Sequence, residues 1–390
     1  MKKLRNNKSL RKYLFGVIAV GAVLFVPAGR IAAQGNIVFW NLENFFDYFD
    51  DGGSSSDADF SSRGSRRWTK ARFAKKCNMI GKALLWMGEN CCADGEPPAV
   101  VGVAEVENAF VLNRLVNSPV LKKLNYGYVH YDSPDRRGID VALLYRRDVV
   151  RVLSSRPVHI YGDDGAVMRT RDILYVYAEL LSEASGPDVA ASPPDNKYEG
   201  LSVKPPRIHL LVNHHPSKFS GAKASMRARE LAMTALRDLC DSIMRVSDAP
   251  IVAMGDFNDT PDGRQFTLIG GQLKNLAEPL SERGEGSIRY DGRWEFIDHF
   301  LVGNMTCSDS GRDVSREGTA ENGADDRPDE DGGCGAFEMG VVQVPFLMTV
   351  DRAHTGFKPM RTYVGPGYVG GVSDHCPILF RFYGNKAKIL

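Results

Sequence analysis

The sequence predicts an α+β fold with much antiparallel strand pairing. Candidate strands outnumber candidate helices, and several strands follow one another without an intervening helix. A regular βαβ alternation would instead place a helix after each strand. The 390 residues are 43% hydrophobic and 25% charged, which excludes a disordered chain, a collagen-like repeat and a polytopic membrane protein.

The first 33 residues have the pattern of a secretory signal peptide. A basic stretch precedes the apolar run 14–26, and small residues follow up to Ala33. A membrane-spanning helix, the alternative, needs about 20 apolar residues, whereas this run has 13 and contains Gly16 and Gly21. We expect cleavage after Ala33, export to the periplasm or the extracellular space, and no membrane anchor in the mature chain.

The charge is unevenly distributed along the chain. Residues 1–33 hold seven of the 49 basic residues and none of the 48 acidic ones, so the remaining chain has a formal charge of −6. The segment 308–331 has nine acidic and three basic residues, which alone gives −6. The rest of the mature chain is neutral by formal count, which neither favours nor excludes a nucleic acid as partner. We expect a monomer.

Apolar spacing predicts the elements of a single domain over 34–390. Apolar residues recurring every three or four positions predict helices over 67–87, through Val111 and Leu115, and over about 225–244. Apolar runs and alternating patterns predict strands over 36–40, 100–104, 126–131, 139–145, 173–180, 207–213, 251–254, 296–302 and 378–382. Polar segments near 50–65, 183–206 and 308–335 are expected as a loop and two surface insertions.

All seven cysteines follow residue 33. An odd number leaves at least one thiol unpaired in an exported protein. No C-x-x-C pair is present, so a zinc ribbon is not indicated. Cys307 and Cys334 flank the acidic segment and could form a disulfide at its base.

Polar residues follow, interrupt or directly precede six of the predicted strands. One such residue is weak evidence, because strands commonly end in Asp or Asn turns. Six positions that mix carboxylates, amides and imidazoles predict strand ends that converge on one pocket. The residues are Asn41, Glu105, His214, Asp256 with Asn258, Asp298, and Asp374 with His375.

This set of side chains predicts metal-assisted attack of water on a phosphate ester. Glu105 and Asn41 offer hard oxygen ligands, which suit Mg²⁺ or Mn²⁺, with Ca²⁺ as an alternative. Imidazoles can transfer protons near neutral pH, and neutral amides can hold a phosphoryl oxygen. The sequence contains no Walker A loop, no GxGxxG and no G-x-S-x-G elbow.

Other polar residues nearby are expected to be structural. His215 and His299 follow site residues directly, and neighbouring residues in a strand point to opposite faces. The segment DFNDTPDG is not an EF-hand loop, because its positions 6 and 12 are Pro261 and Thr267 rather than Gly and Glu. The basic residues along 218–229 are expected on a solvated helix face.

Eight segments in order resemble the endonuclease/exonuclease/phosphatase superfamily. They are FWNLENFFD, GVAEVEN, RGIDVALLYR, TRDIL, VNHHPSK, MGDFND, FIDHFLV and SDHCPI, and they extend from about residue 36 to 382. The resemblance implies a four-layer αββα sandwich of two mixed β-sheets covered by helices, with the active site at one edge.

The resemblance also implies roles for the residues that hold metal and phosphate. Asn41 and Glu105 match the family's metal-site positions, and Asp374 matches a residue near the metal. Arg171 matches a residue that contacts the substrate phosphate, and Asn258 matches one that holds it.

Further matches imply roles in proton transfer. His214 matches the general acid of the deoxyribonuclease-like branch, and Asp256 matches a residue that orients the attacking water. His375 is expected to be the base, oriented by Asp298. Asp132 is a candidate to orient His214.

The substrate is less well defined, because members of one fold act on many phosphoesters. VNHHPSK is similar to the N-H-x-x-S-K form of secreted bacterial nucleases and lacks the H-x-Q of sphingomyelinases. We expect a nuclease that acts on DNA or RNA. The alternatives are a phosphatase, a phospholipid phosphodiesterase of the inositol-phosphate or sphingomyelinase kind, and a non-catalytic binding module.

Overall fold

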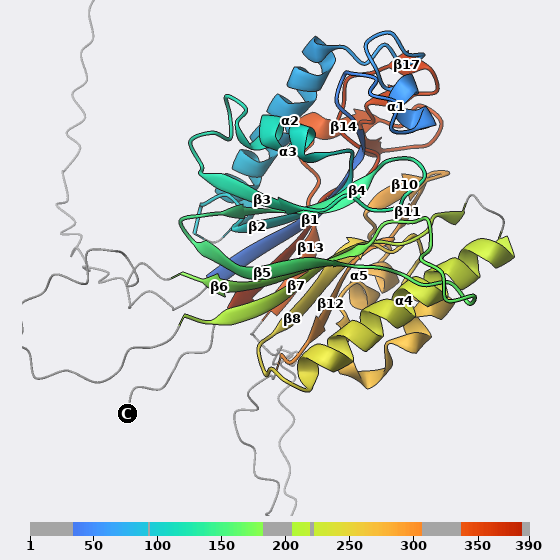
Figure 1. Ribbon diagram of the computed structural model, residues 1–390. Helices are drawn as coiled ribbons and strands as arrows, with labels where there is room; N and C mark the ends of the chain where they lie inside the picture. Colours follow the sequence, from blue (N-terminus) through green and yellow to red (C-terminus); the bar gives the residue numbers. More distant parts are fainter. Residues whose placement is uncertain (1–33, 93, 182–204, 219–221, 306–336, 384–390) are drawn as a thin grey trace, which may run out of the picture. The chain divides into compact units, whose positions relative to one another are not determined.

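The computed structural model (Figure 1) describes residues 34–92, 94–181, 205–218, 222–305 and 337–383. The chain divides into two units, Met1–Ile31 and Ala32–Leu390, and all described residues belong to the second. The predicted signal peptide, the acidic segment and nearly all of 183–206 lie outside the described residues. No described helix is both long enough and apolar enough to cross a membrane.

Two mixed six-stranded sheets form the centre of the second unit. The first has the spatial order β13 (Phe337–Val341), β18 (Ile378–Tyr383), β1 (Gln34–Phe45), β2 (Val100–Val106), β4 (Asp140–Arg146) and β3 (Tyr126–His130). The second has the order β5 (Val150–Val158), β6 (Ile173–Leu180), β7 (Arg207–His214), β8 (Ile251–Asp256), β12 (Asp298–Gly303) and β9 (Lys274–Asn275). Each sheet has one parallel pair, β1 with β2 and β7 with β8, and its other neighbours are antiparallel.

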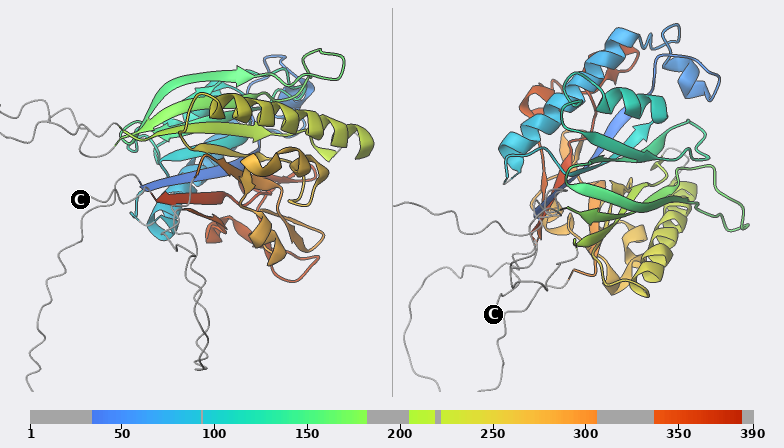
Figure 2. Two further views of the ribbon diagram at one scale, coloured as in Figure 1. Left: turned by 90° about the horizontal axis from the view of Figure 1, so that it is seen from below. Right: turned by 60° about the vertical axis from the view of Figure 1, so that its left-hand side comes forward.

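The alternation of side chains along these strands produces four layers. In β1, Val38 and Trp40 belong to an outer core, whereas Ile37 and Phe39 belong to the core between the sheets. The outer core of the first sheet includes α2 (Lys70–Cys91) and α3 (Ala109–Val116). The second sheet packs its outer face on α4 (Ala222–Met244), and both coverings are visible in Figures 1 and 2. The fold is therefore the expected αββα sandwich with two mixed sheets.

The predicted helices and strands are present with shifted ends. The strand at Ile173–Leu180 has the predicted bounds, whereas β1 extends to Phe45, five residues beyond the prediction. Asn108 caps α3 by accepting the N–H of Val111. Apolar periodicity thus located the core segments, and it placed their ends less well because polar residues continue several strands.

Short and exposed elements were not predicted. The segment near 50–65, expected as loop, contains α1 (Ser55–Asp59), whose N-cap Ser54 accepts the N–H of Asp57. Strand β5 lies at a sheet edge, and Val150 is the one buried side chain among its nine residues. A register shift after Val152 interrupts the alternation of its side chains, so the strand shows no clear period. The remaining missed elements have two to five residues each, too few to show a period. They are β9, β13, α5 (Glu278–Glu282), β10 (Ile288–Tyr290), β11 (Arg293–Glu295), β14 (Met348–Val350), β15 (Phe357–Pro359), β16 (Tyr363–Val364) and β17 (Gly367–Tyr368).

The described cysteines form no disulfide. Cys77, Cys91, Cys92, Cys240 and Cys376 are all free thiols. Burial raises the pKa of four of them to about 12, so these are inert at neutral pH: Cys77, Cys92, Cys240 and Cys376. Cys307 and Cys334, proposed above as a pair, lie outside the described residues.

Candidate active site

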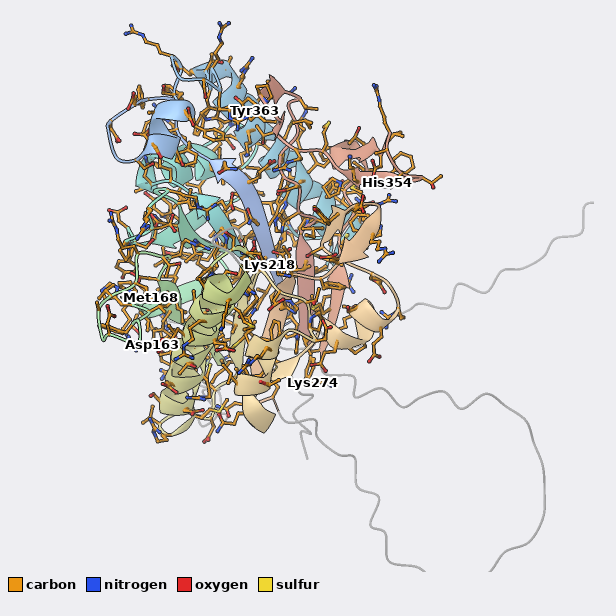
Figure 3. The ribbon with its side chains drawn as sticks, turned by 90° about the vertical axis from the view of Figure 1, so that its right-hand side faces the viewer. Asp163, Met168, Lys218, Lys274, His354 and Tyr363 are labelled. Atoms are coloured by element: carbon orange, nitrogen blue, oxygen red, sulfur yellow. The ribbon has the colours of Figure 1, made fainter. Side chains whose placement is uncertain are left out.

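The candidate site lies where the parallel strand pairs of the two sheets meet. Asn41 and Glu105 lie in β1 and β2, and His214 and Asp256 are the last residues of β7 and β8. Because parallel neighbours run in one direction, their carboxyl-terminal parts bring these side chains to one edge. Figure 3 views this edge, with Lys218, four residues after His214, near its centre.

Two of these residues lie inside strands rather than after them, which corrects the prediction that they follow strand ends. The register between β1 and β2 shifts after Asn41, and that between β2 and β4 shifts after Ala104. Glu105 and Asn258 have φ of +62° and +52°, a left-handed conformation that costs free energy outside glycine. Such irregularities turn a strand's side chains toward a site, and they occur often beside active sites.

Asp256 is the centre of the site. Its Oδ2 accepts a hydrogen bond from Asn41 Nδ2 at 3.0 Å and lies 3.6 Å from His214 Nε2 and 3.9 Å from His375 Nε2. Its Oδ1 accepts the N–H of Asn258 at 2.8 Å. Burial, with the charge of Asp298, raises the pKa of Asp256 to about 7. One carboxylate thus faces two imidazoles and two amides.

His375 is held in one orientation by a carboxylate. Its Nδ1 lies 2.7 Å from Asp298 Oδ2, and its Nε2 faces both Asp256 and Asp374, the latter at 3.9 Å. Burial lowers the pKa of His375, but the negative charges of Asp298 and Asp256 prevail and raise it well above its ordinary value. The ring therefore presents Nε2 to the site and can hold a proton there.

His214 is neutral in the surroundings that the structure shows. Its Nε2 lies 3.9 Å from Glu105 Oε1. Burial and the neighbouring Arg171 and Arg137 lower its pKa well below the ordinary value. Its Nδ1 has no hydrogen-bond partner among the described residues, so the prediction that Asp132 orients it was wrong: Asp132 instead lies with His130 and Asp140.

The predicted metal residues each lie near Asp256 or one of its two imidazoles. Glu105 Oε2 accepts the N–H of Asn44 at 2.7 Å. Among the described residues, Oε1 has only His214 and Arg137 nearby, each at 3.9 Å. Asn41 Oδ1 accepts the N–H of Glu43 at 2.9 Å. Asp374 Oδ2 pairs with Arg361 at 3.1 Å. The oxygen donors are those that Mg²⁺, Mn²⁺ or Ca²⁺ require, and Glu105 Oε1 has no close donor, so the residues fit a divalent cation.

A second grouping of possible metal ligands overlaps the site. Asp256, Asp298 and His375 have ligand atoms within 4.8 Å of one another. His375 Nδ1 and Asp298 Oδ2 are hydrogen-bonded to each other, so neither of these two atoms is free to bind a metal ion. This arrangement favours proton transfer over metal binding. The group His130, Asp132 and Asp140 lies outside the site.

Arg171, predicted to contact the substrate phosphate, directs its guanidinium to protein acceptors in this structure, and its contact with a phosphate stays a prediction. The side chain is buried, and each of its three nitrogens donates to the protein. The acceptors are the carbonyls of His214 and His215, at 3.1 and 2.6 Å, and Asp135 Oδ2, at 3.0 Å. Its guanidinium therefore positions the end of β7. The matching of sequence motifs gave its place in the chain but not the direction of its side chain.

His215 and His299 lie outside the reacting groups. Nδ1 of His215 is 2.7 Å from Gln265 Oε1, and His299 contacts Asn275 and the carbonyl of Asp259. Burial lowers their pKa values to about 3 and about 4. Both rings are neutral packing residues at ordinary pH.

A buried charged cluster beside the site was not predicted from the sequence. Lys76 is fully buried and donates to the carbonyl of Glu43 at 2.7 Å and to Thr362 Oγ1 at 2.9 Å. Glu43 in turn accepts from Arg361 Nε at 2.7 Å. The position of Glu43, two residues after Asn41, was the one available signal, because Lys76 looks like any other cation of an amphipathic helix.

The sequence model of the Endonuclease/Exonuclease/phosphatase family matches residues 36–185 and 199–314, well over half of the chain. The chain belongs to this family, whose members are metal-dependent phosphoric ester hydrolases. No curated protein matches the sequence.

Several solved structures are similar at low identity. A family member from Bacteroides thetaiotaomicron is 13% identical over 91% of this chain and 99% of its own, with a TM-score of 0.48. A mannosyl-6-phosphatase from the same organism is 13% identical over 89% and 98%, with a TM-score of 0.48. The catalytic domain of human nocturnin with bound sulfate is 12% identical over 90% and 94%, with a TM-score of 0.47.

Proposed function

We propose that this chain is an exported phosphodiesterase that hydrolyses nucleic acid, with DNA as the first substrate to test. The observation that carries the proposal is the pair of imidazoles, His214 and His375, whose Nε2 atoms both face Asp256 Oδ2 at 3.6 and 3.9 Å. Two proton-transfer groups beside one carboxylate supply both the base and the acid that ester hydrolysis needs.

The residues divide the reaction between them. His375, oriented by Asp298, takes the proton of the attacking water together with Asp256. The raised pKa of His375 does not exclude this role, because a divalent cation bound beside Asp374 would lower the pKa of the adjacent imidazole and free Nε2 to accept a proton. His214 protonates the leaving oxygen. Its neutral state does not exclude this role, because a bound phosphate anion raises the pKa of an adjacent imidazole. The amide of Asn258 donates to the carbonyl of His215 at 3.0 Å and can hold a phosphoryl oxygen with its second N–H.

Glu105, Asn41 and Asp374 would hold a divalent cation. A cation bound there supplies Lewis-acid stabilisation of the charge that develops on the phosphoryl group. Mg²⁺ is the first ion to test, followed by Mn²⁺ and Ca²⁺.

Exposed cations at the edge support a polyanionic substrate. Arg137, Lys218 and Arg361 have side chains that are 40%, 57% and 48% exposed. Each lies beside a site residue in sequence or in space, so a nucleic-acid strand that crosses the site would pass them. The likeness of VNHHPSK to secreted nucleases supports the same substrate.

Export is part of the proposal and rests on the pattern of residues 1–33. Amino-terminal sequencing of the protein from a host's periplasm and medium tests it. We expect the mature chain to begin at Gln34, and recovery of the uncleaved chain in the membrane fraction would contradict it.

A panel of substrates tests the proposed reaction. We expect Mg²⁺-dependent cleavage of plasmid DNA and of bis(4-nitrophenyl) phosphate, and loss of both on chelation. Preferred hydrolysis of the monoester 4-nitrophenyl phosphate would favour a phosphatase, and hydrolysis of sphingomyelin a phospholipid phosphodiesterase. A folded protein inactive on all four would favour a binding module.

A further inference from the structure

A pocket of about 440 Å³ adjoins the candidate active site. It lies between the end of β1, the segment that follows α1, and the β16–β17 hairpin with the residues just before it. In Figure 3 this end of the molecule is marked by Tyr363, above Lys218. The side chains that matter below are those of Glu43, Phe60, Arg66, Arg361 and Tyr363.

Arg66 is a cation held in place without a counter-ion. Its guanidinium carbon lies 5.6 Å from the ring centre of Phe60 and 5.4 Å from that of Tyr363. One terminal nitrogen donates to the carbonyl of Gly365, and the Tyr363 hydroxyl donates to the carbonyl of Arg66 at 2.9 Å. In the described part of the chain no carboxylate lies within 4 Å of this guanidinium. The side chain is therefore oriented while its charge remains available.

Arg361 connects this pocket to the reacting groups. It contacts Glu43 Oε1 at 2.7 Å and Asp374 Oδ2 at 3.1 Å, and Asp374 in turn lies 3.9 Å from His375 Nε2. A molecule that fills the pocket would thus lie beside the candidate site rather than on a remote surface.

The one carboxylate in the pocket is already compensated. Glu43 Oε1 accepts from Arg361, Oε2 accepts the N–H of Thr362 at 3.0 Å, and the ammonium of Lys76 lies behind it on the Glu43 carbonyl. Asp374 also pairs with Arg361, so the groups in and beside the pocket are three cations, Arg66, Arg361 and Lys76, and two carboxylates. The remaining positive charge is that of Arg66, and the pocket favours an anion.

The chain around Arg66 extends the positive charge over the surface. Residues 63–76 contain seven Lys or Arg and no acidic residue, although the chain after residue 33 has a formal charge of −6. Within this stretch Arg63, Arg67, Lys70 and Lys75 are exposed. The electrostatic potential around the pocket is therefore positive, although the net charge of the chain after residue 33 is negative, and it would attract an anion to the pocket.

We propose that this pocket binds a second phosphate group of the substrate, next to the phosphate that is cleaved, with Arg66 as its principal ligand. This inference rests on the proposed phosphodiesterase function. Guanidinium groups pair with phosphate through charge-assisted hydrogen bonds, and the two aromatic rings limit the conformational freedom that Arg66 would lose on binding.

Dinucleotides that differ by one phosphate test the inference. The substrates are dTpdT, the same molecule with a 5′-phosphate, and the same molecule with a 3′-phosphate. We expect the full mature chain with Mg²⁺ to show a lower KM for one of the two phosphorylated forms than for dTpdT. Arg66→Gln should reduce the ratio of the KM for dTpdT to the KM for that form about tenfold. A tenfold change corresponds to about 1.4 kcal/mol, which is the free energy expected for the loss of one charged hydrogen bond.

Two variants serve as controls. Arg63→Gln removes an exposed cation of the same stretch that does not line the pocket, and it should keep the preference. Arg66→Lys keeps the charge but loses the planar fork, and it should retain part of the preference. Thermal unfolding of each variant shows whether the fold is kept. Equal KM values for all three dinucleotides with the wild type, or an unchanged preference in a folded Arg66→Gln, would overturn the inference.

Calorimetric binding separates this inference from the proposed function. Thymidine 3′,5′-bisphosphate should bind more tightly than either thymidine monophosphate, and Arg66→Gln should remove the difference, even if the protein cleaves no diester. Fructose 1,6-bisphosphate tests whether the second phosphate must belong to a nucleotide. If it binds as tightly as thymidine 3′,5′-bisphosphate, any bisphosphate suffices, and if it binds more weakly, a nucleotide is required. Binding of the two thymidine monophosphates as tightly as the bisphosphate would refute a second phosphate site.

Discussion

Single atoms decide the chemistry of the candidate site. Asp256 Oδ2 accepts a hydrogen bond from the amide of Asn41 and faces the imidazoles of His214 and His375. The ring of His375 has one orientation because its other nitrogen, Nδ1, is hydrogen-bonded to Asp298. The sequence predicted these residues because each is a polar side chain in or beside an apolar strand. It missed the burial of Lys76 and the hydrogen bonds of Arg171 to the end of β7, because spacing along a chain does not tell which way a long side chain points.

Replacing Asp298 tests the orientation of His375. Asp298→Asn keeps the volume of the side chain and removes the charge that stabilises the protonated ring. We expect kcat for bis(4-nitrophenyl) phosphate to fall by about 10²-fold or more, with a much smaller change in KM. A comparison with His354→Asn, at an exposed residue, controls for loss of a polar side chain. Wild-type kcat in Asp298→Asn would show that His375 needs no partner.

The burial of His209 predicts that the free energy of unfolding depends on pH, independently of catalysis. The ring lies against Tyr177 and contacts Tyr175 and Ser247, and burial lowers its pKa to about 4. The unfolded chain, with an ordinary His pKa of about 6.5, takes up this proton at higher pH. The stability from His209 is therefore complete above pH 6.5 and is lost as the pH falls from 6.5 to 4.

Urea unfolding across this pH range measures the effect. His209→Gln should reduce the slope of the unfolding free energy against pH between 6.5 and 4, whatever its effect at pH 7. A variant with the wild-type slope would mean that the pKa of His209 does not differ between the folded and the unfolded chain.

Secondary-structure elements bring these atoms together through the two parallel pairs. Strands β1 and β2 in one sheet and β7 and β8 in the other supply Asn41, Glu105, His214 and Asp256. Apolar periodicity predicted all four strands, because their residues are buried on both faces. It could not predict the bulges at Asn41 and Glu105, since these depend on how one strand pairs with its neighbour rather than on the strand's own residues.

Gly255 tests how closely β7 and β8 must approach. A Cβ at this position would lie 2.4 Å from the backbone oxygen of Asn213 and 2.9 Å from its carbonyl carbon. Gly255→Ala should therefore force the strands apart, lower the free energy of unfolding by about 1–3 kcal/mol, and reduce kcat by moving Asp256 away from His214. Chemical unfolding and turnover measure the two effects.

The matched control is a strand glycine with open space. At Gly340, in β13, an added Cβ meets no atom within 4 Å, so Gly340→Ala should change stability and activity little. Similar losses in the two variants would show that the approach of β7 and β8 is not the cause.

For the whole molecule, the sequence predicted the sandwich through strand count and motif order, and the structure confirms it. The charge distribution could be read only in part. The acidic segment 308–331 and the basic stretch 63–76 are both visible in the sequence, but only the structure shows that the basic stretch adjoins the candidate site, through Arg66 and its contact with the β16–β17 turn. Total charge alone therefore said nothing about the substrate.

Deleting the acidic segment tests its influence on substrate binding. Replacement of 308–331 by an uncharged linker of equal length removes a formal charge of −6. We expect tighter binding of DNA at low salt and a difference that shrinks as the Debye length falls to about 10 Å at 0.1 M. Fluorescence anisotropy over a salt series measures it. Identical affinities at every salt concentration would place the segment far from the substrate's path.

Turnover of bis(4-nitrophenyl) phosphate by His375→Ala with Mg²⁺ present tests the assignment of the active site most directly. We expect a fall in kcat of about 10²- to 10⁴-fold with the thermal unfolding midpoint little changed. His354→Ala, at an exposed histidine, should behave as the wild type. Near-wild-type turnover by a folded His375→Ala protein would contradict the assignment of the active site to the groups around Asp256.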